Sequence, residues 1–163
     1  GRVITENEGL EHLVRRYLSG FGPASVSDIS SWAGIPITTL KPVVDAMTLR
    51  RFRAATDSEL VDLPRQPIPG PETPAPVRFL PTWDATLLAH ARRTQILPEE
   101  YRSAIFNSKN PQSLTTFLVD GAVAGIWRQE GEKVVFEPFA PLPKATRREL
   151  EDEASRLAAF LSD

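Results

Sequence analysis

Residues 25–63 read SVSDISSWAGIPITTLKPVVDAMTLRRFRAATDSELVDL, and within this stretch the spacing of the apolar residues changes from helical to extended. Ser25 is followed three residues later by Asp28, which is the arrangement of a capping box at the start of a helix. Gly34 supplies a natural end for that helix. We therefore predict a short helix between these signals. Its core-facing residues are expected to be Ile29 and Trp32.

Another helix is predicted within residues 36–50, PITTLKPVVDAMTLR, because apolar residues recur there on one helical face. Proline lacks an N–H group and is tolerated in the first turn of a helix. Pro42 therefore indicates that this helix is capped by Thr38 or Thr39. The residues expected to face the core are Leu40, Val43, Val44 and Met47.

The apolar period then becomes two, so residues 51–63 are predicted to form two short strands around a polar turn. A third amphipathic helix is predicted upstream, within residues 8–22. Three helices followed by a β-hairpin is the order of a winged helix, with its third helix as the recognition helix and the hairpin as the wing. We predict such a domain over residues 1–63.

Residues 64–76 hold six prolines and are interpreted as a stiff, extended linker, with a proline-rich docking motif as the alternative. Residues 77–163 are predicted to form an α+β domain. A strand and a helix pair come first, a three-stranded antiparallel β-meander follows, and an amphipathic helix closes the chain. Tight turns are indicated at Asp120-Gly121 and Glu130-Gly131. The helix pair is placed at residues 82–91 and 98–107.

The composition excludes several classes of protein. The chain carries a net charge of −2. It contains no cysteine, and this absence rules out disulfides, thiolate catalysis and cysteine–zinc sites. Because His12 and His90 lie far apart in the sequence, we predict no metal site, and no cofactor motif is present. No apolar run is long enough to span a membrane and no secretory leader is visible, which suits a cytoplasmic protein.

Candidate nucleic-acid contacts gather around the end of the third helix of the predicted winged helix. A net charge of −2 argues against indiscriminate coating of nucleic acid, so a DNA-binding surface has to be local. Three arginines where the wing begins could straddle a phosphate backbone; the alternative is a solvated, salt-bridged surface turn. The candidates are Thr38, Thr39 and Lys41 on the outward face of the helix, and Arg50, Arg51 and Arg53 on the wing.

A second candidate cluster lies in FLPTWDATLLAHARRTQIL, residues 79–97. We expect Asp84 to cap or orient the start of the helix and Trp83 to pack inward. The end of that helix is expected to expose His90, Arg92 and Arg93, where they either contact DNA or complement the helix dipole. A hydrolytic dyad of Asp84 and His90 is a further alternative, although residues six apart do not share a helical face. The other residues expected to be buried are Phe79, Leu80, Leu87 and Leu88.

Three separated blocks of the sequence resemble one bacterial family. They are YLSGFGPASVSDISSWAGI (17–35), FLPTWDATLLAHARRTQILPEEYRSAIF (79–106) and FLVDGAVAGIWR (117–128). In this order they resemble the winged-helix DNA-binding family that includes the alkylpurine and interstrand-crosslink DNA glycosylases. The resemblance implies tandem winged helices and a small β-rich region that grip duplex DNA around a damaged base.

The resemblance also implies catalysis through a glutamine-based QxQ or QxD motif that positions water. Neither pattern occurs in this chain, whose glutamines are Gln66, Gln95, Gln112 and Gln129. In the family the motif precedes the FGPAS block, so the chain is expected to be the C-terminal half of a longer protein. Its expected partners are double-stranded DNA and the missing N-terminal domain.

Two interpretations stay open. The first is a DNA-binding module of a repair protein that does not release bases by itself. The second is a winged-helix interaction domain whose third helix binds protein. The arginine clusters and the resemblance favour the first interpretation, and the single lysine and aspartate on the recognition helix favour the second.

Overall fold

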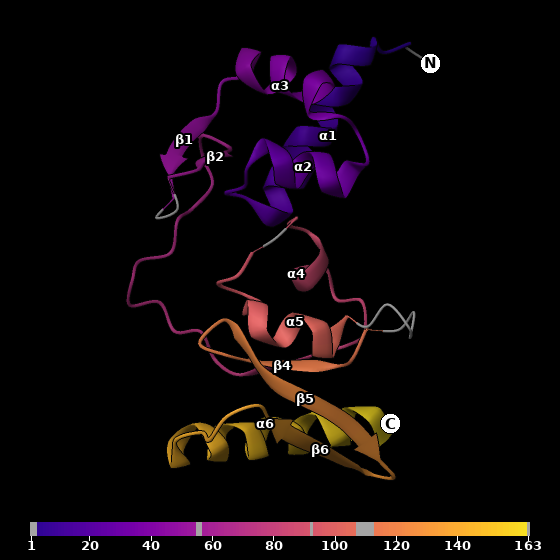
Figure 1. The fold of residues 1–163 in the computed structure, drawn as a ribbon, viewed down its shortest axis with the longest axis vertical. Helices are drawn as coiled ribbons and strands as arrows, with labels where there is room; N and C mark the ends of the chain where they lie inside the picture. Colours follow the sequence, from indigo (N-terminus) through magenta and orange to yellow (C-terminus); the bar gives the residue numbers. More distant parts are fainter. Residues whose placement is uncertain (1–2, 55–56, 92, 107–112, 163) are drawn as a thin grey trace. The chain divides into compact units, whose positions relative to one another are not determined.

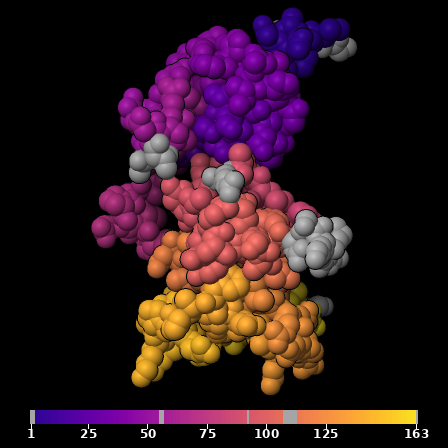
Figure 2. Space-filling model, in the orientation of Figure 1, coloured from indigo at the N-terminus to yellow at the C-terminus, as the bar shows by residue number. Residues whose placement is uncertain are grey.

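The computed structural model describes residues 3–54, 57–91, 93–106 and 113–162, and the chain divides into two compact units (Figure 1). The first unit holds Gly1–Gly70 together with Leu88–Arg92, and the second holds Pro71–Leu87 together with Arg93–Asp163. Residues 64–76 contain no helix or strand, and every residue there except the half-buried Gln66 is exposed (Figure 2).

The first unit begins with two helices, α1 (Glu6–Phe21) and α2 (Val26–Ala33). As predicted, α2 starts with a capping box, in which the Ser25 hydroxyl accepts the N–H of Asp28 and the Asp28 carboxylate accepts the N–H of Ser25. Gly34 ends the helix with a left-handed φ of 65°, a conformation that glycine adopts without strain. The local signals around α2 are therefore confirmed.

Helix α3 (Ile37–Ala46) starts earlier than the sequence predicts. Pro36 occupies the cap position, and its carbonyl accepts the N–H of Thr39 at 3.0 Å. Neither Thr38 nor Thr39 caps the helix, so that prediction was wrong. The physical reason is that the Pro36 carbonyl accepts the N–H groups of Thr39 and Leu40, so the first turn forms without a side-chain cap. Pro42 consequently lies inside the helix and not in its first turn.

The core of the first unit forms where the three helices meet. The predicted apolar face of α3 is confirmed, because all four of its residues are buried. Trp32, however, is 45% exposed, and the prediction that it is buried was wrong. Its ring lies 5.2 Å from that of the fully buried Tyr17, so Trp32 covers the core from outside. The buried α3 residues are Leu40, Val43, Val44 and Met47.

A two-stranded antiparallel sheet follows α3. It pairs β1 (Arg50–Arg53) with β2 (Glu59–Asp62). The buried Val61 of β2 also forms a bridge to Ala24 through two backbone hydrogen bonds of 2.8 and 3.0 Å. The hairpin is therefore hydrogen-bonded to the backbone ahead of α2, and the predicted order of three helices and a hairpin is present.

The second unit is built on one antiparallel sheet with the strand order β3-β4-β5-β6. The strands are β3 (Arg78–Leu80), β4 (Thr116–Val119), β5 (Ala122–Glu130) and β6 (Lys133–Pro138). The three predicted meander strands are β4, β5 and β6. The strand predicted after the linker is β3, which pairs with β4 and extends the meander to four strands.

The turns of the meander follow glycine positions. Asp120 and Gly121 have φ angles of 50° and 78° between the paired residues Val119 and Ala122, as expected for a tight turn with two positive φ angles. In the second turn the central residues are Gly131 and Glu132. That turn lies one residue later than predicted, because Glu130 still pairs with Lys133.

Two hydrophobic cores lie on opposite faces of this sheet. Because successive strand residues point to opposite faces, Phe117 packs with Leu150 of α6 (Lys144–Ser162), whereas Leu118 packs with Ile105 of α5 (Glu99–Ile105). Figure 1 shows α6 on one side of the strands and α5 on the other. The sheet is therefore sandwiched between helices of its own unit.

The helix predicted over residues 82–91 is reduced to the single turn α4 (Ala85–Leu88). Its continuation is prevented by hydrogen bonds to the rest of the first unit. The carbonyl oxygen of Ala89 accepts the Tyr17 hydroxyl at 2.6 Å, and the N–H of Ala91 donates to Asp28 Oδ1 at 2.9 Å. A longer helix would use these same backbone groups internally.

Two glycines offer a matched test of packing in the two units. A Cβ at Gly125 would collide with the Glu137 carbonyl oxygen and the Phe117 ring, whereas a Cβ at Gly20 in α1 would meet nothing within 4 Å. We expect Gly125→Ala to lower the free energy of unfolding by roughly 1–3 kcal/mol. Gly20→Ala should raise it by about 0.5–1 kcal/mol, since alanine suits a helix better. Urea denaturation followed by circular dichroism measures both; equal midpoints for the two variants would contradict the packing described.

Candidate nucleic-acid interface

The outward face of α3 places the predicted helix contacts together. Thr38, Thr39 and Lys41 are all exposed. The Lys41 ammonium lies 2.7 Å from the Asp45 carboxylate one turn later. The hydrogen bond from Lys41 is the main cause of a lowered pKa for Asp45, and Arg51 adds to it. This face of α3 therefore carries an ion pair and two free hydroxyl side chains.

Strand β1 places three arginines beside α3. Arg51 donates to Glu59 at 3.0 Å and reaches Asp45 of α3 at 3.5 Å, so it joins the helix to the hairpin. The Glu59 hydrogen bond is the main cause of the raised pKa of the Arg51 guanidinium. Arg53, which is mostly exposed, pairs with Asp57 at 2.8 Å.

Arg50 differs from the other two arginines because its described partners are neutral. Its Nη1 donates to the Gln66 carbonyl at 3.3 Å, and its guanidinium lies 5.1 Å from the centre of the Phe52 ring. Along a strand, alternate residues share a face, so Arg50 and Phe52 lie opposite Arg51 and Arg53. A hollow of about 280 Å³ lies between the Arg51 and Arg53 side chains and the carboxylates of the hairpin.

The charge balance of this surface is close to neutral. Its four cations, Lys41, Arg50, Arg51 and Arg53, lie among three carboxylates, those of Asp45, Asp57 and Glu59. Exposed ion pairs of this kind contribute only about 0–1 kcal/mol each. A stronger anion, such as a phosphate that accepts two hydrogen bonds from one guanidinium, can therefore displace the carboxylates at small cost.

The second predicted cluster is arranged differently from the prediction. His90 is half-buried, and its Nε2 lies 3.0 Å from the Phe21 carbonyl oxygen. Arg93 is also half-buried and belongs to the second unit, and Arg92 lies outside the described residues. The prediction that His90 and Arg93 are exposed at a helix end was wrong, because residues 88–91 pack into the first unit.

Asp28 is the anchor of that packing, a role the sequence pattern did not reveal. It is only 9% exposed and accepts three hydrogen bonds, from the Ser25 N–H, the Ser25 hydroxyl and the Ala91 N–H. Burial raises the pKa of this carboxyl. Its hydrogen bonds and the nearby His90 together lower the pKa by more, so it lies below the usual value. The only sequence signal for Asp28 is its place in the capping box.

In the second unit, Trp83 was predicted to be buried but is 53% exposed. Of the other residues predicted to be buried there, Leu80 is buried and Phe79 and Leu87 are partly buried. Leu88, which belongs to the first unit, is exposed, so that prediction was wrong. The predicted role of Asp84 is confirmed, since its Oδ1 accepts the Thr86 N–H at 2.8 Å and orients the start of α4.

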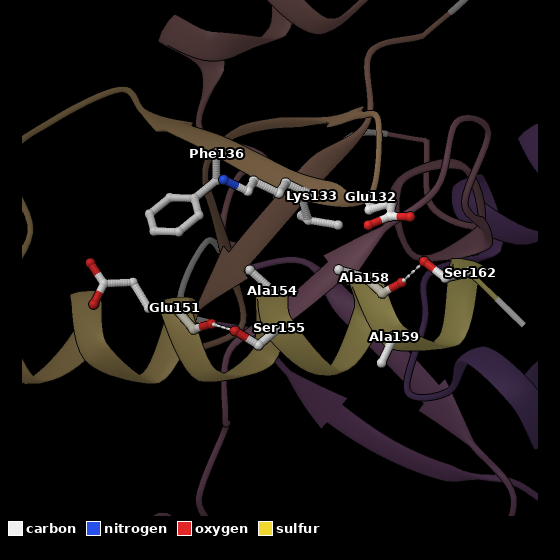
Figure 3. A pocket seen from close by; sticks show the side chains of 10 residues that line it. Glu132, Lys133, Phe136, Glu151, Ala154, Ser155, Ala158, Ala159 and Ser162 are labelled. Carbon is white, nitrogen blue, oxygen red and sulfur yellow. Dashed lines mark hydrogen bonds between the residues drawn. The ribbon is translucent and has the colours of Figure 1, made fainter.

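A groove of about 670 Å³ lies between β6 and α6 of the second unit (Figure 3). Phe136 and Lys133 line one side, and Ala154 and Ala158 line the other. The serine hydroxyls of α6 donate to carbonyls of their own helix. Across the described ranges, no cluster of histidine, aspartate and glutamate could hold a metal ion, and no described helix could cross a membrane.

The described residues form six helices and two antiparallel sheets, and this fold is similar to that of a solved DNA glycosylase. The structure of Streptomyces sahachiroi DNA glycosylase AlkZ matches 97% of this chain with a TM-score of 0.80 and 20% sequence identity. A model of the family "DNA glycosylase AlkZ-like" matches residues 2–160. The chain therefore belongs to the AlkZ-like DNA glycosylase family, which confirms the resemblance seen in the sequence.

A curated relative gives the same assignment. The interstrand DNA cross-link repair glycosylase of Streptomyces sahachiroi is 22% identical over 171 residues, which cover 97% of this chain. The match covers 44% of the relative and 44% of the solved structure. The chain thus spans less than half the length of the proteins it matches.

The anchoring role of Asp28 can be tested by stability at different pH values. Asp28→Ala should lower the free energy of unfolding at pH 7 by roughly 2–3 kcal/mol, because it removes a helix cap and leaves the Ala91 N–H unpaired. Ser25→Ala, which removes the cap hydroxyl alone, should cost about 1 kcal/mol. Urea denaturation of both variants and the parent protein measures these differences.

The pH dependence has a definite sign. The pKa of Asp28 is lowered on folding, so its contribution is fully present above the unfolded value of about 3.8 and is lost as the pH falls through the folded pKa. The stability gap between the parent and Asp28→Ala should therefore shrink below about pH 4. A gap that stays constant from pH 7 to pH 3 would show that the carboxylate form has no special role.

Proposed function

We propose that this chain is the C-terminal, DNA-binding portion of an AlkZ-like DNA glycosylase. In this proposal the first unit acts as a winged helix, with α3 as its recognition helix and the β1–β2 hairpin as its wing. Family membership and the match to less than half of the relatives' length support it. The proposal places the protein at duplex DNA, with the nucleoid in the cytoplasm as its location.

The observation that carries the proposal is the link between α3 and β1. Arg51 reaches Asp45 at 3.5 Å, so the exposed face of the helix and the arginine-bearing strand are neighbours. In helix-turn-helix proteins the second helix enters the major groove while adjacent elements contact the backbone. Threonine hydroxyls on the helix and arginines on the strand suit these two tasks, since Arg and Thr side chains are common phosphate and base contacts.

The proposed interface consists of side chains brought together in the first unit. Thr38, Thr39 and Lys41 face the groove, and the three arginines contact phosphates, which replace carboxylate partners at Arg51 and Arg53. His90 is left out of this surface because its Nε2 lies against the Phe21 carbonyl. The proposed arginine contacts are Arg50, Arg51 and Arg53.

A second candidate function is a protein-interaction module. The carboxylate pairing of Lys41, Arg51 and Arg53 favours it, because a surface whose cations are already paired attracts polyanions weakly. The two functions differ in their response to salt. Phosphate contacts release counterions, so the affinity for DNA falls steeply as the salt concentration rises. The affinity for a protein partner is expected to fall less steeply, because no counterions condensed on DNA are released.

We infer that base release needs residues outside these 163 residues. The QxQ or QxD pattern is absent. Two of the glutamines are already engaged, because Gln66 Nε2 donates to the Ser19 carbonyl and Gln129 Nε2 donates to the Gly131 carbonyl. The partner in catalysis would be the remainder of a full-length family member, which carries the water-positioning motif.

The salt dependence of DNA binding tests the interface. Each phosphate contact contributes about 0.9 to the slope of log affinity against log salt. Arg50→Ala combined with Arg53→Ala should therefore reduce the slope for a duplex by about one to two units. Fluorescence anisotropy with a labelled duplex at several salt concentrations measures it.

Two controls sharpen this test. Arg147→Ala with Arg156→Ala removes two exposed, ion-paired arginines of α6 and should leave the slope unchanged. Glu59→Gln frees Arg51 from its carboxylate partner and should tighten binding at low salt. Equal slopes of log affinity against log salt for the parent and the Arg50/Arg53 variant would contradict the proposed DNA interface and favour the protein-interaction module.

Because base release is assigned to residues outside this chain, we expect the chain alone to have no glycosylase activity. The 163-residue chain should bind duplex DNA but release no alkylated base, because no water-positioning glutamine pair is present. Incubation with alkylated duplex, followed by chromatography of free bases, checks this. Base release by a pure preparation, abolished in Asp84→Asn, would instead support hydrolysis by the Asp84 and His90 pair.

A further inference from the structure

Trp83 is both exposed to solvent and held in a strained backbone conformation, and each of these is unfavourable for a large apolar residue that has no binding role. Its side chain is 53% exposed, and its backbone φ is 59°, in the left-handed region. A bulky residue is a genuine outlier in this region, which glycine occupies freely. Residues held in such conformations cluster at functional sites, where the surrounding structure over-determines them.

The turn that carries Trp83 is fixed on both sides. The N–H of Trp83 donates to the hydroxyl of Ser113 at 2.8 Å, and Ser113 is only 3% exposed. The next residue, Asp84, accepts the Thr86 N–H through its side chain and the Leu87 N–H through its carbonyl oxygen. The turn therefore fixes the backbone that carries the exposed indole.

The other two tryptophans show what a structural role looks like in this fold. Trp127 donates its indole N–H to the Leu80 carbonyl at 2.8 Å, and its ring lies 5.8 Å from that of Phe79. Trp32 covers Tyr17 at 5.2 Å. Trp83 has one ring neighbour in the described structure, Phe106, at the longer distance of 6.4 Å and an angle of 41°. Packing therefore explains Trp83 less well than it explains the other two.

We propose that Trp83 is a stacking platform for an unpaired DNA base. This inference rests on the proposed function and adds the element that reads a distorted site. The aromatic face of a tryptophan stacks on any base, whatever its identity. An intact duplex offers no free base face, so this contact requires a base that is unpaired or turned out of the helix.

A protein partner is a poorer fit to the same patch. Among the described residues of the second unit, the large apolar side chains exposed near this turn are Trp83 and Leu114, a small area compared with the roughly 800 Å² per partner of a stable protein interface. One base needs only one ring face. The structure therefore assigns to Trp83 a role in binding damaged DNA in preference to intact DNA.

The test compares two duplexes that differ at one position. One is intact, and the other holds an unpaired base opposite an abasic site; binding is measured by fluorescence anisotropy at fixed salt. Trp83→Ala should reduce the preference for the abasic duplex by about tenfold, whereas Trp83→Phe should retain most of it. The salt slope should not change, because no phosphate contact is lost. The matched control is Trp32→Ala, which removes the other exposed tryptophan and should leave the preference intact.

Trp83→Gly separates stacking from a structural role. Glycine adopts a φ of 59° without steric strain, so the melting temperature of the variant should stay the same or rise. The preference for the abasic duplex should be lost. A lower melting temperature with an unchanged preference would overturn the proposal and make Trp83 a packing residue.

The outcomes also distinguish this inference from the proposed function. If Trp83→Ala keeps the preference while the Arg50/Arg53 variant loses salt slope, Trp83 does not stack and DNA binding stands. If the parent chain binds neither duplex at low salt, both proposals fail.

Discussion

The hydrogen bond between the Asp28 carboxylate and the Ala91 N–H constrains both the first unit and the path of the chain. The same carboxylate caps α2, so one side chain sets the start of a helix and the position of a segment 63 residues later. Tyr17 reinforces it by binding the Ala89 carbonyl from the core. Because these contacts use backbone groups of residues 88–91, α4 is limited to a single turn.

The sequence predicts those parts of the fold that depend on neighbours in the chain. The Ser25 and Asp28 capping box, the apolar face of α3 and the Asp120-Gly121 turn each follow from spacing alone, and each is confirmed. The two misplaced tryptophans share one cause. Trp32 and Trp83 were predicted to face inward from the local helical pattern, but such a pattern does not say whether the core is already filled. Tyr17 fills the core beneath Trp32, and the turn at Trp83 is hydrogen-bonded to Ser113, 30 residues later in the chain.

The sequence predicts where the arginines of the candidate site lie, but it does not predict which carboxylates they pair with. Arginines that follow a third helix are visible in the sequence, whereas the partner carboxylates are contributed across a hairpin and from the neighbouring helix. Arg51 shows this most clearly, since Glu59 comes from β2 and Asp45 from α3. Sequence separation hides such pairs, because cross-strand register decides them. In the proposed function, phosphates displace these carboxylates from the arginines, so the affinity for DNA is expected to depend on ionic strength.

The proline-rich segment looks like a natural place to divide the molecule, yet the first unit is discontinuous. The chain leaves this unit at residue 70, returns at residue 88 and leaves again after residue 92. A fragment that stops within residues 64–76 would therefore lack Ala89 and Ala91. The Tyr17 hydroxyl would lose its bond to the Ala89 carbonyl, and the Asp28 carboxylate would lose the Ala91 N–H. Proteolysis in the exposed linker would nick the chain without releasing an intact first unit. The two units are consequently coupled in biosynthesis, because the first is completed only after part of the second has been made.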